Sequence, residues 1–234
     1  MRVLAINSSP RAQDSCTDKI LIPLLAGMKK AGASIETVYL GKLKINHCKG
    51  CFNCWTKTPG KCIHKDDMPS VLQKYIEADF LILATPLYYF NVSGLMKNFL
   101  DRTLPLAKID MKEGKSGLTE HFGRYKTNLN KILLVSPCGY PEFDHFVHLV
   151  SYVKFLAGNF GCEYIGEILR PAAEMLRIDE CQPMFKSYYA NLKVAGEQLI
   201  TKGKISKKIR DELHKLFIQP KEYRKLVNVG FAKK

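Results

Sequence analysis

The stretch RVLAINSSPRAQDSCTDKI (Arg2 to Ile20) joins a short apolar run to a loop of small polar residues and then to a helical pattern. An unbroken apolar run of this length is typical of a buried strand in a parallel sheet. Apolar residues continue at helical spacing at Leu24 and Met28, and the pattern ends at Gly32. The stretch therefore predicts a β-strand, a loop and an α-helix, in that order.

The same alternation continues along the chain. Four more apolar or alternating runs predict strands over 34–40, 79–85, 131–137 and 162–169, and helical patterns lie between and after them, over 66–78, 92–104, 141–161 and 181–203. Regular β-α alternation predicts an α/β fold with a five-stranded, doubly wound parallel sheet and helices on both faces. Residues 105–130 are polar and irregular, and we interpret them as an excursion or a lid.

Length and composition limit the class of protein. The 234 residues, 46% of them hydrophobic, are enough for one large domain with an appendage. The apolar run at the amino end is too short for a signal peptide, and no run approaches the ~18 apolar residues of a membrane helix. We expect a soluble, cytoplasmic protein without a membrane partner. In a reducing cytosol the eight cysteines favour ligands, catalytic groups or core residues over a disulfide framework.

The basic charge is concentrated in the last part of the chain. The formal net charge is +14, and residues 202–234 hold eleven Lys or Arg against three acids. We therefore divide the chain into a domain over 1–201 and a basic helical extension over 202–234. Such an extension could contact nucleic acid. Because it lacks a recognisable binding motif, a solvated helix pair packed on the domain is the favoured interpretation.

Three loops follow strand ends, where ligands bind in open parallel sheets. The first, SSPRAQDSCT, offers hydroxyls, an arginine and a helix start, which suit a phosphate, although a simple N-cap is the alternative. The second, TPLYYFNVSG, offers aromatic side chains that can wall a flat ring, or that pack in the core. The third, SPCGYPEF, has a turn that brings backbone close to such a ring. One phosphate loop and two ring loops predict a mononucleotide site.

These loops resemble those of the flavodoxin-like NAD(P)H-dependent FMN reductases. The residues that carry the resemblance are NSSPR with SCT, ATPLYYFNVSGLMKNFLDR and SPCGY; Ser8 stands where the family has Gly. The resemblance covers roughly residues 1–200 and implies FMN as the cofactor. It implies that the phosphate is bound by Ser9, Arg11, Ser15, Cys16 and Thr17, and that the isoalloxazine is surrounded by Pro86, Leu87, Tyr88, Tyr89, Phe90, Asn91, Pro137, Cys138, Gly139 and Tyr140.

A compact cysteine motif lies between the second strand and the second helix. Its spacing is C-x2-C-x2-C-x7-C, at Cys48, Cys51, Cys54 and Cys62. Three cysteines at this spacing can wrap an iron-sulfur cubane, with the fourth closing the site. Zinc is less favoured because it prefers separated C-x2-C pairs, and unligated or regulatory thiols remain an alternative.

The motif resembles that of the iron-sulfur flavoproteins, a branch of the same reductase group. The resemblance implies a [4Fe-4S] cluster next to the flavin, with those four cysteines as ligands. Because the motif follows the second strand, we expect it on the same rim of the sheet as the flavin loops.

The function implied is that of an FMN-dependent oxidoreductase. Electrons would come from NAD(P)H or a ferredoxin, pass through flavin and cluster, and reach a small-molecule acceptor. We expect no catalytic acid/base residues, because the flavin carries the chemistry. Residues 105–130 are a candidate cover for the substrate side of the flavin. The resemblance also implies a homo-oligomer, a dimer or tetramer. The alternative is a flavodoxin-like electron carrier without a substrate of its own, which the basic charge disfavours.

Overall fold

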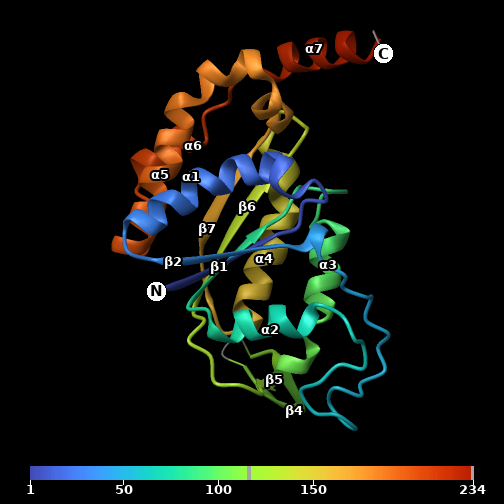
Figure 1. Ribbon diagram of the computed structural model, residues 1–234. Helices are drawn as coiled ribbons and strands as arrows, with labels where there is room; N and C mark the ends of the chain where they lie inside the picture. Colours follow the sequence, from blue (N-terminus) through green and yellow to red (C-terminus); the bar gives the residue numbers. More distant parts are fainter. Residues whose placement is uncertain (115–116, 233–234) are drawn as a thin grey trace.

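Five parallel strands form the central sheet, in the order β2-β1-β3-β6-β7 (Figure 1). The computed structural model describes residues 1–114 and 117–232. Each neighbouring pair in the sheet is parallel, so the predicted architecture is confirmed. The strands are β1 (Arg2–Asn7), β2 (Ser34–Tyr39), β3 (Phe80–Ala84), β6 (Lys131–Pro137) and β7 (Glu163–Arg170).

Helices cover both faces of this sheet. Side chains alternate along each strand, so Val3 and Ala5 join the core under one helical layer, and Leu4 and Ile6 join the core under the other. The first layer contains α1 (Cys16–Lys30) and α5 (Lys186–Thr201); the second contains α2 (Met68–Glu77), α3 (Gly94–Asp101) and α4 (Val147–Asn159). The predicted helices correspond to these five.

Two glycines allow α1 and α5 to pack backbone against backbone. A Cβ atom on Gly27 would collide with the carbonyl of Lys193, and one on Gly196 would collide with the carbonyl of Leu24. Neither position has room for a side chain without a shift of a whole helix.

The segment 105–130 is more ordered than predicted. It contains β4 (Ala107–Glu113) and β5 (Thr119–Gly123), which form a separate antiparallel sheet; residues 115–116 of the segment lie outside the described part. Lys112 lies opposite Glu120, and the two side chains form an ion pair at 2.9 Å. Opposite charges across a strand pair stabilise the pairing, which is why a polar segment can form strands.

The basic extension folds as two helices: α6 (Lys207–Leu213) lies beside α5, and α7 (Pro220–Ala232) lies at the top of the view in Figure 1. Ile209, Leu213 and Tyr223 are buried and belong to the same core as α1 and α5. The fully buried Arg170 at the end of β7 donates hydrogen bonds to the carbonyls of Leu213 and Lys215. The extension is therefore anchored to the sheet through the last strand.

Candidate functional site

The loop between β1 and α1 ends at a buried helix N-terminus. The hydroxyl of Ser15 caps α1 by accepting a hydrogen bond from the N–H of Asp18 at 3.1 Å. The hydroxyl of Thr17, 1% exposed, has no hydrogen-bond partner within the described residues. A helix N-terminus with an additional unpaired hydroxyl is suited to an anion, because the N–H groups and the helix dipole attract negative charge.

A strained turn follows β3. The N–H of Tyr88 donates to the carbonyl of Asn91 at 3.0 Å, and the N–H of Asn91 donates back at 3.1 Å. Between them Tyr89 and Phe90 have φ values of +46° and +61°, a conformation that bulky residues rarely adopt. Tyr89 is 99% exposed, so burial does not explain its conformation. Backbone strain of this kind is concentrated at functional sites.

The loop after β6 presents open backbone beside an aromatic pair. The N–H of Cys138 donates to the carbonyl of Arg170 at 2.8 Å, which fixes the loop to the end of β7. A Cβ atom on Gly139 would meet nothing within 4 Å, so the backbone there is accessible to a ligand. The ring of Tyr140 lies parallel to that of Phe90, with centroids 6.2 Å apart.

The three loops enclose one small pocket, called here the strand-end pocket. The sequence-predicted residues that line it are Ser9, Arg11, Ser15, Cys16, Thr17, Pro86, Leu87, Tyr88, Pro137, Cys138 and Gly139. The other four, Tyr89, Phe90, Asn91 and Tyr140, lie on the same loops but outside this lining. The structure therefore brings together residues from three separate parts of the chain.

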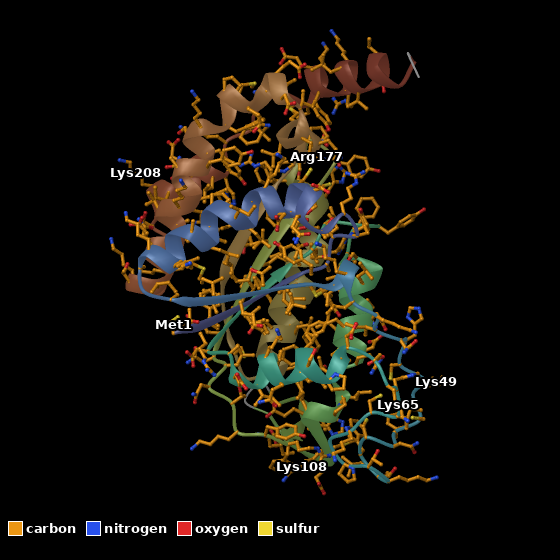
Figure 2. All side chains as sticks on the ribbon, viewed as in Figure 1. Met1, Lys49, Lys65, Lys108, Arg177 and Lys208 are labelled. Atoms are coloured by element: carbon orange, nitrogen blue, oxygen red, sulfur yellow. The ribbon has the colours of Figure 1, made fainter. Side chains whose placement is uncertain are left out.

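Sequence reasoning missed Ala173 and Glu174, which also line the strand-end pocket. The carboxylate of Glu174 accepts hydrogen bonds from Arg11 at 3.2 Å and from Arg177 at 3.3 Å; Figure 2 labels Arg177 at the upper end of the molecule. Burial, followed by the charge of Glu174, raises the pKa of Cys16 to about 11. The signal that could have found Glu174 is its position just after the fifth strand, where a ligand-facing loop is expected.

The four motif cysteines lie on a long loop, residues 46–67, which contains neither helix nor strand; we call it the cysteine loop. Cys54 is buried, Cys48 and Cys62 are half-buried, and Cys51 is exposed. Figure 2 labels Lys49 and Lys65 of this loop at the lower right edge of the molecule, far from Arg177. The loop thus runs along the side of the domain.

A buried ion pair holds both ends of the cysteine loop. Arg102, just after α3, donates to the two carboxylate oxygens of Asp66 at 2.7 and 3.1 Å, and these side chains are 1% and 0% exposed. Asp66 also accepts from the N–H groups of Asn46 and Met68. Burial alone would raise the pKa of Asp66, but the hydrogen bonds from Arg102 and these N–H groups hold it well below its usual range.

The same arginine lies against the cysteine motif. Its guanidinium is close to the thiol of Cys62, and its buried Nε atom has no hydrogen-bond partner within the described residues. Arg102 therefore both anchors the cysteine loop and faces its last cysteine.

The four thiols are near one another without forming a closed metal site. Burial raises the pKa of Cys54, with smaller contributions from Cys62, Cys48 and Cys51. In the part of the chain that the structure describes, no three His, Cys, Asp or Glu side chains stand close enough together to hold a metal ion. The donor set has the right chemistry for an iron-sulfur cluster, but the sulfur atoms are not at ligand distances.

The cysteines do not lie on the rim of the strand-end pocket, contrary to expectation. The hydroxyl of Ser93, which caps α3 at the pocket end, donates to the carbonyl of Ser8 at 3.0 Å. Arg102 and Cys62 are at the other end of α3, and a helix of eight residues is about 12 Å long. The cysteine loop begins beside the same ion pair, because Asn46 donates to Asp66 and its carbonyl accepts from Arg102, so both ends of the loop lie at that end of α3. The position of the loop after β2 in the sequence did not reveal this placement.

A second and larger cavity lies between the cysteine loop and the β4–β5 hairpin, with a volume of about 800 Å³. Cys48, Gly50 and Trp55 line it from the loop, and residues of β5 line it from the hairpin. No described residue from 105–130 lines the strand-end pocket, so within one chain the segment does not cover that pocket. Figure 2 labels Lys108 of the hairpin at the bottom of the molecule, far from Arg177 in its upper part.

Residues 1–121, somewhat more than half of the chain, match the family model of the NADPH-dependent FMN reductases. The chain belongs to this family. The matched part contains the β1–α1 loop, the turn after β3 and all four motif cysteines. The loop after β6 lies outside it.

Several curated relatives of this chain carry the name iron-sulfur flavoprotein. One from Archaeoglobus fulgidus is 38% identical over 117 residues, which cover 50% of this chain and 52% of that protein. Another from the same organism is 29% identical over 199 residues, covering 84% of this chain and 96% of the relative. The chain thus spans about half the length of the first relatives it matches, and nearly all of a more distant one.

Solved structures support the flavodoxin-like fold of the chain. An FMN-dependent NADH-azoreductase from Bacillus anthracis in complex with FMN superimposes with a TM-score of 0.60 at 17% identity, covering 86% of this chain and all of the other. At this level of identity the likeness concerns the fold.

The lining of the strand-end pocket offers groups that suit the two ends of FMN. The unpaired Thr17 hydroxyl at the start of α1 suits a phosphate, and the open backbone at Gly139 allows a flat ring to approach. Among the helices of the described residues, none is both long and apolar enough to cross a membrane.

Proposed function

We propose that this reductase binds FMN in the strand-end pocket and transfers electrons from NAD(P)H or a ferredoxin-type donor to a small acceptor. The observation that carries the proposal is the convergence of three strand-end loops on one pocket around the unpaired, buried hydroxyl of Thr17. Family membership supports the same cofactor.

The chain's own residues would bind and orient the flavin. The N-terminus of α1 and the Thr17 hydroxyl would hold the phosphate, and the turn Tyr88–Asn91 with the loop at Gly139 would hold the ring. When bound, FMN supplies hydride and single-electron transfer. The ion pair between Arg11 and Glu174 lies in the pocket, and a phosphate would compete with Glu174 for the guanidinium.

We further propose that the cysteine loop holds a [4Fe-4S] cluster on Cys48, Cys51, Cys54 and Cys62. Four thiols on one loop, next to the buried Arg102 guanidinium, have the donor chemistry and the compensating charge that an anionic cluster needs. Curated relatives carry the name iron-sulfur flavoprotein, which supports the assignment. A bound cluster supplies one-electron steps. We also propose that the protein is cytoplasmic and works as a homo-oligomer.

Anaerobic purification, followed by an absorption spectrum and by iron and sulfide analysis, tests both parts. We expect one FMN and roughly four irons per chain. Replacing Cys54 by serine should remove the iron and leave FMN bound, whereas Cys181→Ser, a half-buried cysteine outside the motif, should leave both unchanged. Failure to bind added FMN would overturn the flavin assignment, and FMN without iron would overturn the cluster.

Turnover distinguishes an enzyme from an electron carrier. The FMN-loaded protein should oxidise NAD(P)H steadily in the presence of a small acceptor. A protein that accepts electrons only from ferredoxin and reduces no small molecule would instead be a flavodoxin-like carrier.

A further inference from the structure

The larger cavity is a candidate binding site that the flavin does not account for. Its volume of about 800 Å³ lies within the range of ~300–1,000 Å³ that is common for small-molecule sites. None of its lining residues lines the strand-end pocket. A flavin bound in the strand-end pocket would therefore leave this cavity free.

Several aromatic side chains line the cavity. Trp55 from the cysteine loop packs on His121 from β5, with ring centroids 4.7 Å apart. The indole N–H of Trp55 donates to the carbonyl of Leu104 at 2.9 Å, which fixes the orientation of the ring. Phe122 and Tyr125 add further rings from the hairpin. Fixed aromatic rings favour a flat ligand that can stack or contact their edges.

The charged groups of the lining are already neutralised. Lys112 pairs with Glu120 at 2.9 Å, and Asp101 pairs with Lys97 at 2.6 Å. A charged ligand would gain no free counter-charge from these residues and would lose hydration on entry. The lining therefore favours a neutral ligand.

Among the described residues that line the cavity, one buried side-chain atom has no hydrogen-bond partner. The Nδ1 atom of His121 is buried and has no hydrogen-bond partner within the described residues, although His121 lines the cavity. A buried nitrogen of this kind is normally satisfied, by protein, water or ligand. A carbonyl or hydroxyl group on the edge of a ligand ring would satisfy it, depending on the tautomer of the imidazole.

We propose that this cavity binds a neutral, flat aromatic molecule that carries a carbonyl or hydroxyl group, stacked near Trp55 and hydrogen-bonded to His121. Such a ligand would touch the cysteine loop at Cys48 and not the strand-end pocket. If the proposed function holds, the ligand is an electron acceptor on the side of the cysteine motif. A quinone, for example, would take two electrons from the nicotinamide or ferredoxin-type donor and two protons from solvent to become a hydroquinone.

The chain contains one tryptophan, so its fluorescence reports on this cavity alone. Titration of the full chain with 2-methyl-1,4-naphthoquinone should quench the Trp55 emission with a saturable curve, and excess FMN should not displace the ligand. The anionic 1,4-naphthoquinone-2-sulfonate should bind at least tenfold more weakly. Linear quenching without saturation, displacement by FMN, or equal binding of the anionic analogue would each overturn the proposal.

Matched variants identify the hydrogen bond. His121→Phe keeps a ring against Trp55 and removes the nitrogen, so binding should weaken by about fivefold, as expected for one neutral hydrogen bond. His148→Phe, at an exposed position on α4 outside the cavity, should bind as the parent does. If His121→Phe does not fold, Phe122→Ala at a 42% exposed position tests the aromatic wall, and unchanged binding would contradict the proposal. The binding assay needs neither iron nor turnover, so its outcome is independent of the proposed function.

Discussion

The strand-end pocket and the cysteine loop are both candidate cofactor sites, but they are built in opposite ways. The pocket is assembled from loops fixed to strand ends by backbone hydrogen bonds such as that between Cys138 and Arg170. The cysteine loop has no helix or strand, and one buried ion pair, Arg102 with Asp66, fixes its ends. The first site is a product of the fold. The geometry of the second would be completed by its ligand, as is common when metal binding is coupled to folding.

The largest loss of stability is expected from replacing Arg102, whose ion pair with Asp66 fixes the ends of the cysteine loop. Arg102→Leu leaves the Asp66 carboxylate buried without its partner, which typically costs about 3–5 kcal/mol of stability. Urea unfolding of the cofactor-free protein measures the loss. Lys97→Leu on α3, which removes an exposed pair with Asp101, should change stability by less than about 1 kcal/mol.

A second substitution tests whether the loss of stability comes from the unpaired carboxylate of Asp66. Adding Asp66→Asn to Arg102→Leu removes the unpaired charge and should recover part of the stability. If Arg102→Leu alone is as stable as the parent, the ion pair does not hold the cysteine loop, and the contrast between the two sites fails.

Acidification should weaken the cysteine loop before the strand-end pocket. The pKa of Asp66 is lower in the folded protein than its ordinary value of about 4. Its contribution to stability is therefore fully present above pH ~4 and is lost as the pH falls towards the lower folded value. Stability measured by urea unfolding should fall more steeply below pH ~4 for the parent than for Asp66→Asn, because the folded pKa of Asp66 lies below its unfolded value of about 4. Equal slopes would show that Asp66 is not the titrating group.

Thr17→Val at the strand-end pocket should lower the affinity for FMN without lowering the stability of the cofactor-free protein. The hydroxyl is buried without a partner, so its removal should leave the cofactor-free protein as stable or slightly more stable. FMN affinity, followed by flavin fluorescence, should fall by about tenfold because a hydrogen bond to a charged group is lost. Thr201→Val, at an exposed position on α5, is the control for FMN affinity. Unchanged FMN affinity in Thr17→Val would remove this residue from the phosphate site.

The strained turn after β3 should give the smallest effect. Tyr89→Asn places a residue that tolerates positive φ at an exposed position and should raise stability by up to about 1 kcal/mol. FMN affinity should fall severalfold, because the exposed ring is lost. A variant that is less stable than the parent would contradict the assignment of strain to Tyr89.

The sequence by itself determined the sheet, its helical layers and most of the strand-end pocket. Periods of apolar residues are local signals, and parallel strands bring their carboxyl ends to one edge, so Thr17, Pro86 and Cys138 could be grouped without coordinates. The β4–β5 hairpin was missed because its pairing depends on cross-strand charges and not on an apolar pattern.

Only the tertiary structure decided which distant side chains meet. Asp66 and Arg102 are 36 positions apart, Arg11 and Glu174 are 163 apart, and no local pattern marks either pair. The contact between the rings of Trp55 and His121, and with it the larger cavity, depends on where an irregular loop and a polar hairpin pack. Such contacts follow from the packing of the whole chain, because a loop without periodicity carries no local signal of its partner.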